Sequence, residues 1–152
     1  MKWVLAATLC LSGCSSTPPP VAGAPTAEVL IMTPAWQEAG EGPGCEQRPQ
    51  SSDAGPVVAM YVDRRLARLD VTEPGVDTDA GIGVNDSVSA VLKAYGAAVV
   101  VTPHKYTHEQ GGQYLTVPGA ERKRLVFETD GTNVTRYRIG RSPEVDWVEG
   151  CA

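Results

Sequence analysis

The sequence predicts an α+β fold, an antiparallel sheet of about five to seven strands with one short helix packed on it. Runs rich in β-branched and aromatic residues follow one another from Val57 onward, separated by short polar connections. A single stretch shows a clear helical period, and Asp130-Gly131 stands between two strand-like runs as a typical hairpin turn. Because 152 residues suit one domain with a tail, we expect a single domain over 28–152, with its core at about 57–151.

The first two strands are predicted as a hairpin. The run VVAMYV, Val57–Val62, and the run LARLDV, 66–71, are separated by a short polar turn. Three basic residues gather around this turn and are expected to form a solvated hairpin tip: Arg64, Arg65 and Arg68.

Two segments precede this hairpin. EVLIMTPAW, 28–36, is apolar, and two alternatives stay open for it: an extra strand or a segment docked on the domain. EAGEGPGCEQRPQSSDAGP, 38–56, is rich in Gly, Pro and Ser and is predicted to be loop. The domain proper is therefore expected to begin at Val57.

The stretch GIGVNDSVSAVLKAYG, 81–96, predicts the one helix. Asn85 or Asp86 can cap it by accepting from its free N–H groups, and the same capping role explains Ser87. Gly96 can adopt the left-handed conformation that ends a helix. Four apolar residues fall at i, i+3, i+4 and i+7 and predict one buried face: Val88, Val91, Leu92 and Tyr95.

The remaining strands are predicted after the helix. Four β-rich runs and a short last one stand at 98–102, 114–117, 125–128, 134–139 and 145–148. In the run VTRYRI, 134–139, Arg136 and Arg138 alternate with Tyr137 and Ile139. We therefore expect one side of this strand to face water.

The first residues of the chain have the order of a secretory signal. Lys2 gives a positive charge, an apolar run follows over 3–11, and Ser12 and Gly13 are small. The apolar run is far shorter than the roughly 20 residues that a membrane-spanning helix needs. The segment is therefore expected to be a targeting signal and not a membrane span.

LSGC, 11–14, resembles the signal box of bacterial lipoproteins. The resemblance implies cleavage before Cys14, a signal peptide over 1–13 and lipid on the Cys14 thiol. Because Ser15 and not an aspartate follows the cysteine, it also implies a lipid anchor in the outer membrane, with the protein facing the periplasm. The alternative is an ordinary secretory signal in which the cysteine stands by chance.

A tether is predicted over 14–27, where Pro, Ser and Ala dominate and no residue is charged. The whole chain is acidic, with 13 basic against 18 acidic residues and a net charge of −5. It lacks the basic surface of a nucleic-acid-binding protein, so no nucleic-acid partner is expected. It also gains nothing from anionic headgroups, so the lipid on Cys14 would have to hold it at the membrane.

Two further cysteines predict a disulfide. With Cys10 cleaved off and Cys14 lipidated, Cys45 and Cys151 remain, and an exported compartment permits their bond. The bond would close a loop of roughly 100 residues, which the chain-entropy model rates at about 4.7 kcal/mol. A reactive thiol or metal pair is the alternative, but neither cysteine has a CxxC partner or a nearby histidine.

PHKYTHE, 103–109, is the strongest candidate for metal chemistry in the sequence. His104 and His108 are four residues apart, which on a helix would place both imidazoles on one face. Pro103 and the preceding β-branched run favour strand or loop, in which one zinc ion reaches both rings only if the loop bends. Hydrogen-bonded or surface histidines are the preferred interpretation, and no cofactor is expected.

The helix and the strands after it resemble a known structural unit. GIGVNDSVSAVLKAYG followed by β-hairpins resembles a unit of β-lactamase-inhibitor-like proteins and small outer-membrane assembly lipoproteins. Together with PHKY and the terminal EGC it also resembles a group of uncharacterised proteobacterial lipoproteins. In the better-known families the unit is a protein-binding scaffold. The resemblance implies a binding module, not an enzyme, for an envelope protein or a glycan. The alternative is a small metal-dependent envelope hydrolase that uses His104 and His108.

Overall fold

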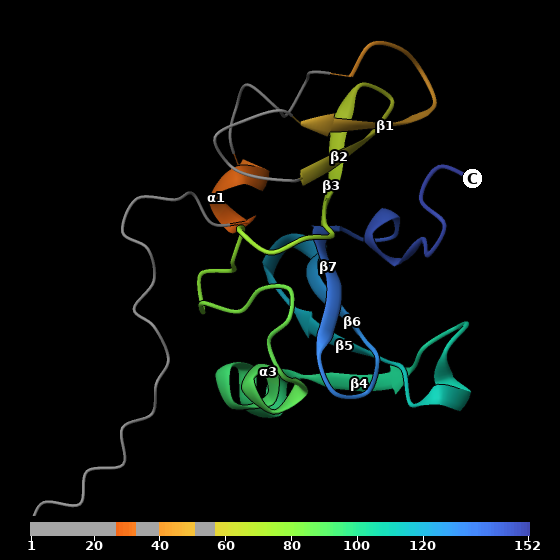
Figure 1. Ribbon diagram of the computed structural model, residues 1–152. Helices are drawn as coiled ribbons and strands as arrows, with labels where there is room; N and C mark the ends of the chain where they lie inside the picture. The colour runs from red at the N-terminus through yellow and green to blue at the C-terminus, as the bar shows by residue number, and fades with distance from the viewer. Residues whose placement is uncertain (1–26, 33–39, 51–56) are drawn as a thin grey trace, which may run out of the picture.

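The computed structural model describes residues 27–32, 40–50 and 57–152. The predicted signal peptide, Cys14 and all of the predicted tether except Ala27 lie outside the described residues. The fold is the predicted α+β type, with a seven-stranded antiparallel sheet in the described part of the chain (Figure 1).

The strands run in the order β1-β2-β3-β7-β6-β5-β4 across the sheet, and each pairs antiparallel with its neighbours. Their bounds are β1 Cys45–Gln50, β2 Val57–Val62, β3 Arg65–Val71, β4 Val100–Pro103, β5 Gln113–Pro118, β6 Lys123–Thr129 and β7 Val134–Arg141. The pairing of β3 with β7 joins the N-terminal strands to the later ones. As a result β1 and β4 are the two edges of the sheet and lie at opposite ends of the molecule (Figure 1).

One face of the sheet forms the hydrophobic core. Alternate residues of each central strand point to this face, as the two-residue period of a strand requires. The fully buried side chains that form it include Ala59, Tyr61, Leu69, Val71, Leu115, Phe127 and Tyr137. Phe127, the only phenylalanine of the chain, lies 5.8 Å from the Tyr95 ring and 5.6 Å from the Tyr137 ring, measured between centroids. This aromatic group occupies the middle of the core.

Helix α3, Val88–Tyr95, is the predicted helix, and its ends are fixed by two residues. Ser87 is the N-cap, and its Oγ accepts a hydrogen bond from the Ala90 N–H at 3.1 Å. Gly96, with φ +57°, ends the helix and donates its N–H to the Leu92 carbonyl. Ser87 and Gly96 therefore cap the helix as predicted, but Gly96 has ψ −137° and does not adopt the left-handed helical conformation expected of it.

The predicted capping by Asn85 and Asp86 is wrong, because the helix begins later than either residue could cap. Asn85 has φ +78° and donates its N–H to the Val134 carbonyl, which ties the turn to β7. The Asp86 carboxylate accepts from the Gly83 N–H at 2.7 Å, so it closes the turn before the helix.

The buried face of α3 is also narrower than predicted. Val91 is fully buried, but Leu92 is 41% exposed. Val88 and Tyr95 are partly buried against the core. A helix of eight residues at one end of the sheet contacts the core through one side, and Leu92 lies beyond that contact.

The segment 28–36 contains a short helix and no strand in its described part. Helix α1, Ala27–Met32, buries Leu30 and Ile31 against the core. Of the two alternatives for this segment, a strand or a segment docked on the domain, the second is therefore correct for these residues. Ala27 N–H donates to the Asp77 carbonyl at 3.0 Å, which fixes the point where the predicted tether meets the domain.

Two other sequence predictions are wrong. The segment 38–56 was expected to be loop but contains β1, whose residues CEQRPQ form a strand because β2 offers them a hydrogen-bonding edge. The run 145–148 was expected to be a strand but begins within a 3₁₀ turn, Glu144–Asp146. The reason for this turn lies on the second face of the sheet.

Candidate functional site

The second face of the sheet carries charged residues at its centre. Arg68 and Asp70 from β3, Arg136 and Arg138 from β7, and Glu128 from β6 alternate with core residues along their strands. The strand register places Asp70 opposite Arg138 and Arg136 opposite Glu128. Opposite charges therefore face each other across neighbouring strands, which stabilises a sheet.

Ion pairs join these residues into a network. Glu128 is almost fully buried and binds Arg138 through Oε1, while its Oε2 lies 3.3 Å from Arg136 Nε. Arg68 Nε binds Asp70 Oδ2 at 2.8 Å. Buried charges are costly unless they are paired and hydrogen-bonded, and each carboxylate here has a guanidinium partner. Burial raises the pKa of Asp70, and the neighbouring Arg68 guanidinium opposes this rise.

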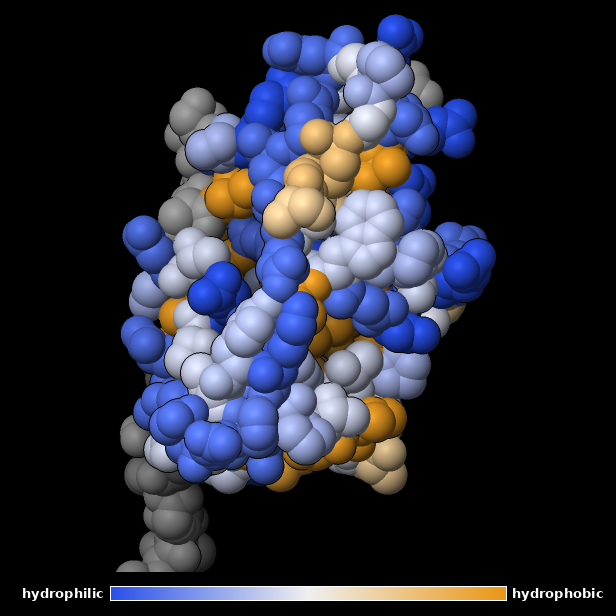
Figure 2. Space-filling model, turned by 90° about the vertical axis from the view of Figure 1, so that its right-hand side faces the viewer, coloured by the Kyte–Doolittle hydropathy of each residue, from blue (hydrophilic) through white to orange (hydrophobic). Residues whose placement is uncertain are grey.

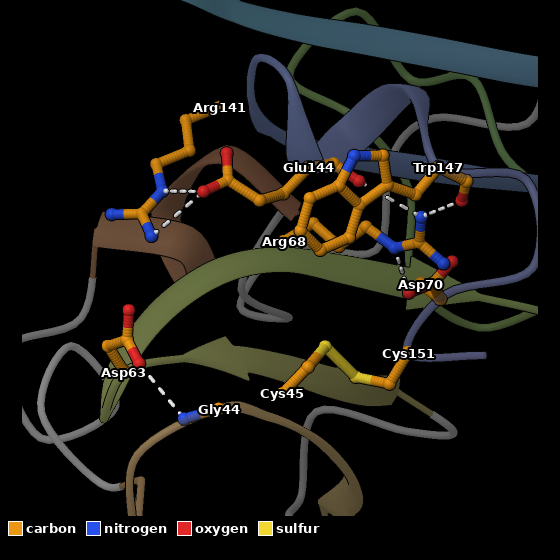
Figure 3. The surroundings of a disulfide bond; sticks show 9 residues. All are labelled: Gly44, Cys45, Asp63, Arg68, Asp70, Arg141, Glu144, Trp147 and Cys151. Atoms are coloured by element: carbon orange, nitrogen blue, oxygen red, sulfur yellow. Dashed lines mark hydrogen bonds and ion pairs between the residues drawn. A yellow bond between two sulfur atoms is a disulfide. The ribbon is translucent and has the colours of Figure 1, made fainter.

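Residues 144–151, named here the C-terminal strap, cross over this charged face. Arg68 Nη1 donates to the carbonyls of Glu144 and Trp147 (Figure 3). Arg138 Nε donates to the Val145 carbonyl at 2.6 Å. Arg68 and Arg138 thus donate hydrogen bonds to backbone carbonyls of the strap. In a strand, these carbonyls would have accepted from the N–H groups of a neighbouring strand. This is the physical reason why the strap turns instead of forming the predicted strand.

Gly140 leaves the room that Arg68 needs. It pairs with Arg68 across β3 and β7, and a Cβ added to it would lie 2.4 Å from the Arg68 Cβ. Any larger residue would displace the Arg68 side chain from its position under the strap. Arg68, expected from the sequence to lie on a solvated hairpin tip, is instead buried.

A disulfide holds the end of the strap. Cys45 and Cys151 are bonded as predicted, with their Cα atoms 5.4 Å apart (Figure 3). The bond fixes the strap to the first residue of β1 and not to a loop. The strap therefore spans the charged face from the end of β7 to the β1 edge.

A side-chain contact holds the strap from a third direction. Glu149 accepts hydrogen bonds from Lys105 Nζ at 2.8 Å and from the Tyr106 hydroxyl, both on the connection between β4 and β5. These bonds hold the pKa of Glu149 below its usual range and raise the pKa of Lys105.

A cavity of about 320 Å³ lies between the strap and the charged face. Its walls come from β1, β2, β3, β6 and β7 and from Val148, Glu149 and Gly150 of the strap. The network arginines Arg68, Arg136 and Arg138 all line it. Of these, the sequence pattern indicated Arg136 and Arg138 as one side of a strand, but nothing in the sequence showed that a later segment covers them.

His104 and His108 come together, but not as a pair of metal ligands. His104 Nδ1 accepts from the N–H groups of Tyr106 and Thr107, at 3.1 and 3.2 Å. Its Nε2 therefore carries the proton and lies 3.3 Å from Glu128 Oε2. Both ring nitrogens of His104 are thus used within the protein.

His108 bends back toward the same loop. Its Nδ1 lies 3.1 Å from the His104 carbonyl and, as the donor, bears the ring proton. Within residues 27–32, 40–50 and 57–152, no group of three or more His, Cys, Asp and Glu residues could hold a metal ion. The contacts of His104 favour its interpretation as a hydrogen-bonded histidine.

The β4 edge is the most apolar exposed strand in the described residues. Val100 is 55% exposed and Val101 is 46% exposed, and no residue from 97 to 103 is charged. Figure 2 shows hydrophobic side chains at the lower end of the molecule, the end where Figure 1 places β4 and α3.

Strand register shows which backbone groups of β4 face outward. His104 N–H donates to the Gly112 carbonyl, so these two residues form a hydrogen-bonded pair. Bonded and non-bonded pairs alternate along an antiparallel ladder. Val101, opposite Leu115, is therefore in a non-bonded pair, and its N–H and carbonyl point away from β5. Val101 thus presents both its N–H and its carbonyl at the edge, beside the exposed side chain of Val100.

Comparisons with known proteins found one similar solved structure and no matching family. No family model matches the chain, and no curated protein matches it. A crystal structure of an extracellular protein containing an SCP domain, from Bacillus anthracis str. Ames, is similar at a TM-score of 0.47 and 13% identity. The match covers 91% of this chain, which spans half the length of that protein. Among the described residues, no helix has the length and apolar character that crossing a membrane requires.

Proposed function

We propose that this chain is a lipid-anchored binding module of the bacterial envelope, without enzymatic activity, and that its β4 edge binds an extended segment of another envelope protein. The observation that carries the proposal is the open, uncharged edge of β4. An exposed strand edge with apolar side chains is a template for pairing with another chain, and proteins normally protect such edges. An edge left unprotected is best explained by a partner that covers it.

The contacts available at β4 suit a short strand. Val101 offers its N–H and carbonyl to a neighbour, and the exposed side chains of Val100 and Val101 point to opposite faces of the sheet. In strand addition, backbone hydrogen bonds supply affinity and side-chain contacts supply specificity. Because residues 97–103 carry no charge, an uncharged segment with small apolar residues fits this edge best.

A second copy of this chain fits the edge less well. If two β4 strands paired antiparallel about Val101, Pro103 would lie opposite Val99. Proline has no N–H, and the Val99 N–H is already donated to the Gly96 carbonyl at 3.3 Å. Neither residue could then extend the ladder beyond Val101. A different partner strand, with free N–H groups, has no such restriction.

The proposed anchor supports a partner within the envelope. The resemblance of LSGC to a lipoprotein signal box supports lipid on Cys14, and Ser15 after it supports an outer-membrane location facing the periplasm. A proline-rich tether extends about 3.1 Å per residue. It would keep the domain close to the membrane surface and within reach of other envelope proteins.

Site-specific photo-crosslinking in cells tests the proposal. A photoreactive residue at Val100 is expected to join one reproducible envelope protein, within an uncharged segment of it. The variant Val101→Pro removes the outward N–H and keeps the bonds to β5, because proline is tolerated where its nitrogen faces outward. It is expected to abolish the crosslink.

The matched control carries the photoreactive residue at Glu46, on the β1 edge, and is expected to give no such product. Crosslinking from Val100 only to a second copy of the chain would contradict the proposal, as would a crosslink that is unchanged by Val101→Pro.

A further inference from the structure

The cavity under the strap is lined by three arginines and three carboxylates. The cavity lies over the second face of the sheet, and none of its lining residues comes from β4. It is therefore a separate site from the proposed docking edge. Arg68, Arg136 and Arg138 line it, with Val58 from β2 and Val148 from the strap. Figure 2 views the molecule from the side that carries the strap.

The carboxylates around the cavity are already paired. Asp70 binds Arg68, and the two oxygens of Glu128 bind Arg138 on one side and Arg136 and His104 on the other. Glu149 binds Lys105 and Tyr106. None of these carboxylates therefore depends on the unused arginine donors.

The arginines keep unused N–H groups. Arg136 contacts Glu128 through Nε alone, and within the described residues neither of its Nη atoms has a hydrogen-bond partner. Nη2 of Arg68 and of Arg138 likewise makes no hydrogen bond to a described residue. The Arg136 side chain is 56% exposed, so its guanidinium can meet a ligand that enters from solvent.

We propose that this cavity binds a small monocarboxylate with a short apolar body, such as an acylated amino acid or the end of a peptide. The planar guanidinium of Arg136 offers the two parallel N–H groups that a carboxylate accepts. Val58 and Val148 contact the apolar body. A volume of about 320 Å³ is at the small end of the range for ligand sites.

The surrounding charges favour a single negative charge on the ligand. Asp70, Glu128 and Glu149 all border the cavity and would repel a dianion more than a monoanion. Their arginine and lysine partners balance them, so a monocarboxylate adds one charge where unused guanidinium donors remain. A phosphate dianion fits this balance less well.

Nuclear magnetic resonance titration of the full lipidated chain in detergent tests the site. N-acetyl-alanine is the probe, and N-acetyl-alanine amide, which lacks the carboxylate, is its control. The carboxylate is expected to bind saturably and to shift the Arg136 Nε–H signal, while the amide leaves it unchanged. Equal binding of the amide would overturn the proposal. Tighter binding of inorganic phosphate would overturn the assignment to a carboxylate.

Variants assign the binding to Arg136. Arg136→Gln is expected to weaken N-acetyl-alanine binding at least tenfold, and Arg136→Lys to weaken it less, because lysine keeps the charge but loses the planar pair of donors. Arg65→Gln removes an exposed arginine that does not line the cavity and is expected to leave binding unchanged. Unchanged affinity in Arg136→Gln would overturn the proposal.

If Arg136→Gln does not fold, a second variant tests whether the ligand binds in this cavity. Thr72 is an exposed residue on the wall of the cavity, so Thr72→Trp fills the entrance without removing a charge. It is expected to abolish binding of N-acetyl-alanine, and binding as tight as in the original chain would count against the cavity. Crosslinking at Val100 is a separate readout, so loss of either site is distinguished from loss of the other.

Discussion

The two edges of the sheet differ in almost every property that governs association. The β1 edge carries Pro49, the charged residues Glu46 and Arg48, and a disulfide at Cys45. Arg48 pairs with Glu46 at 3.4 Å. The β4 edge carries two exposed valines and no charge. Each edge strand contains a proline, Pro49 in β1 and Pro103 in β4. Charged side chains and a disulfide, which hinder strand addition further, occur at the β1 edge alone.

This difference shows that the exposure of β4 is not a general property of the sheet. Both edges belong to the same small sheet, and their neighbouring strands pair antiparallel in the same way. The β1 edge is held by covalent and polar contacts, whereas β4 depends on β5 and on the packing of α3 near it. The two edges are therefore expected to respond differently to substitutions, and the following predictions run from the largest effect to the smallest.

Loss of the disulfide is expected to destabilise the β1 end most. The bond joins residues 106 positions apart, and the chain-entropy model rates a loop of about 100 residues at about 4.7 kcal/mol. Urea unfolding with and without reductant measures the difference. The double variant Cys45→Ser/Cys151→Ser is the control and should not respond to reductant. Equal unfolding midpoints for the oxidised and reduced protein would show that the bond does not stabilise the domain.

Substitutions in α3 test the core at the β4 end. Val91→Ala removes a fully buried side chain and is expected to lower the free energy of unfolding by about 2 kcal/mol. Leu92→Ala, one residue further on, changes an exposed side chain and is expected to cost less than about 0.5 kcal/mol. Thermal or urea unfolding of the two variants gives the comparison. A larger loss in Leu92→Ala would reverse the assignment of the buried face.

A lysine at the open edge is expected to change binding but not folding. Val101→Lys places on β4 the kind of charge that protects edges, and its effect on the free energy of unfolding should stay within about 0.5 kcal/mol. The yield of the Val100 crosslink should fall severalfold, because a partner strand would have to cover the charge. A crosslink of full yield in a folded Val101→Lys protein would show that the partner does not lie along the edge.

The contact of the strap with the β4–β5 connection is expected to have a small effect that depends on pH. The pKa of Glu149 is lowered below its ordinary value of 4.5 by hydrogen bonds from Lys105 and Tyr106. Its contribution to stability is therefore present above the unfolded value and is lost as the pH falls through the lower folded value. Because the pair is exposed, the contribution is small.

Urea midpoints measured from about pH 3 to about pH 7 test this effect, because the Glu149→Gln variant cannot lose a proton there. The variant should show a shallower fall in stability on the acid side than the original chain. Identical pH profiles would mean that the strap does not depend on this contact.

The central strands could be predicted from the sequence because their residues favour strands in any context. Val57–Val62 is β2 with the predicted bounds, and the alternation of Arg136 and Arg138 with Tyr137 and Ile139 assigned the two faces of β7 correctly. The helix could be predicted for the same local reason, because its apolar period and its N-cap, Ser87, both lie within one short stretch of the sequence.

The strap, β1 and the cavity could not be predicted because they depend on contacts between distant residues. CEQRPQ has little strand preference and becomes β1 only beside β2. The run 145–148 has the composition of a strand. However, Arg68, 76 positions earlier than Glu144, donates a hydrogen bond to the Glu144 carbonyl, where the strap turns. Only the disulfide, among the long-range contacts, was visible in advance, because Cys45 and Cys151 were the two cysteines that remained.

The disulfide also determines how the domain would respond to a mechanical pull. Cys45 and Cys151 close a covalent ring that contains all seven described strands, β4 among them. A force applied between the two ends of the chain passes from Cys45 through the bond to Cys151, so it can extend only the residues outside the ring while the bond is intact. A force applied at β4 instead meets two covalent paths to Cys45, one back along the chain and one forward through Cys151 and the disulfide. The strands on both paths would share that load.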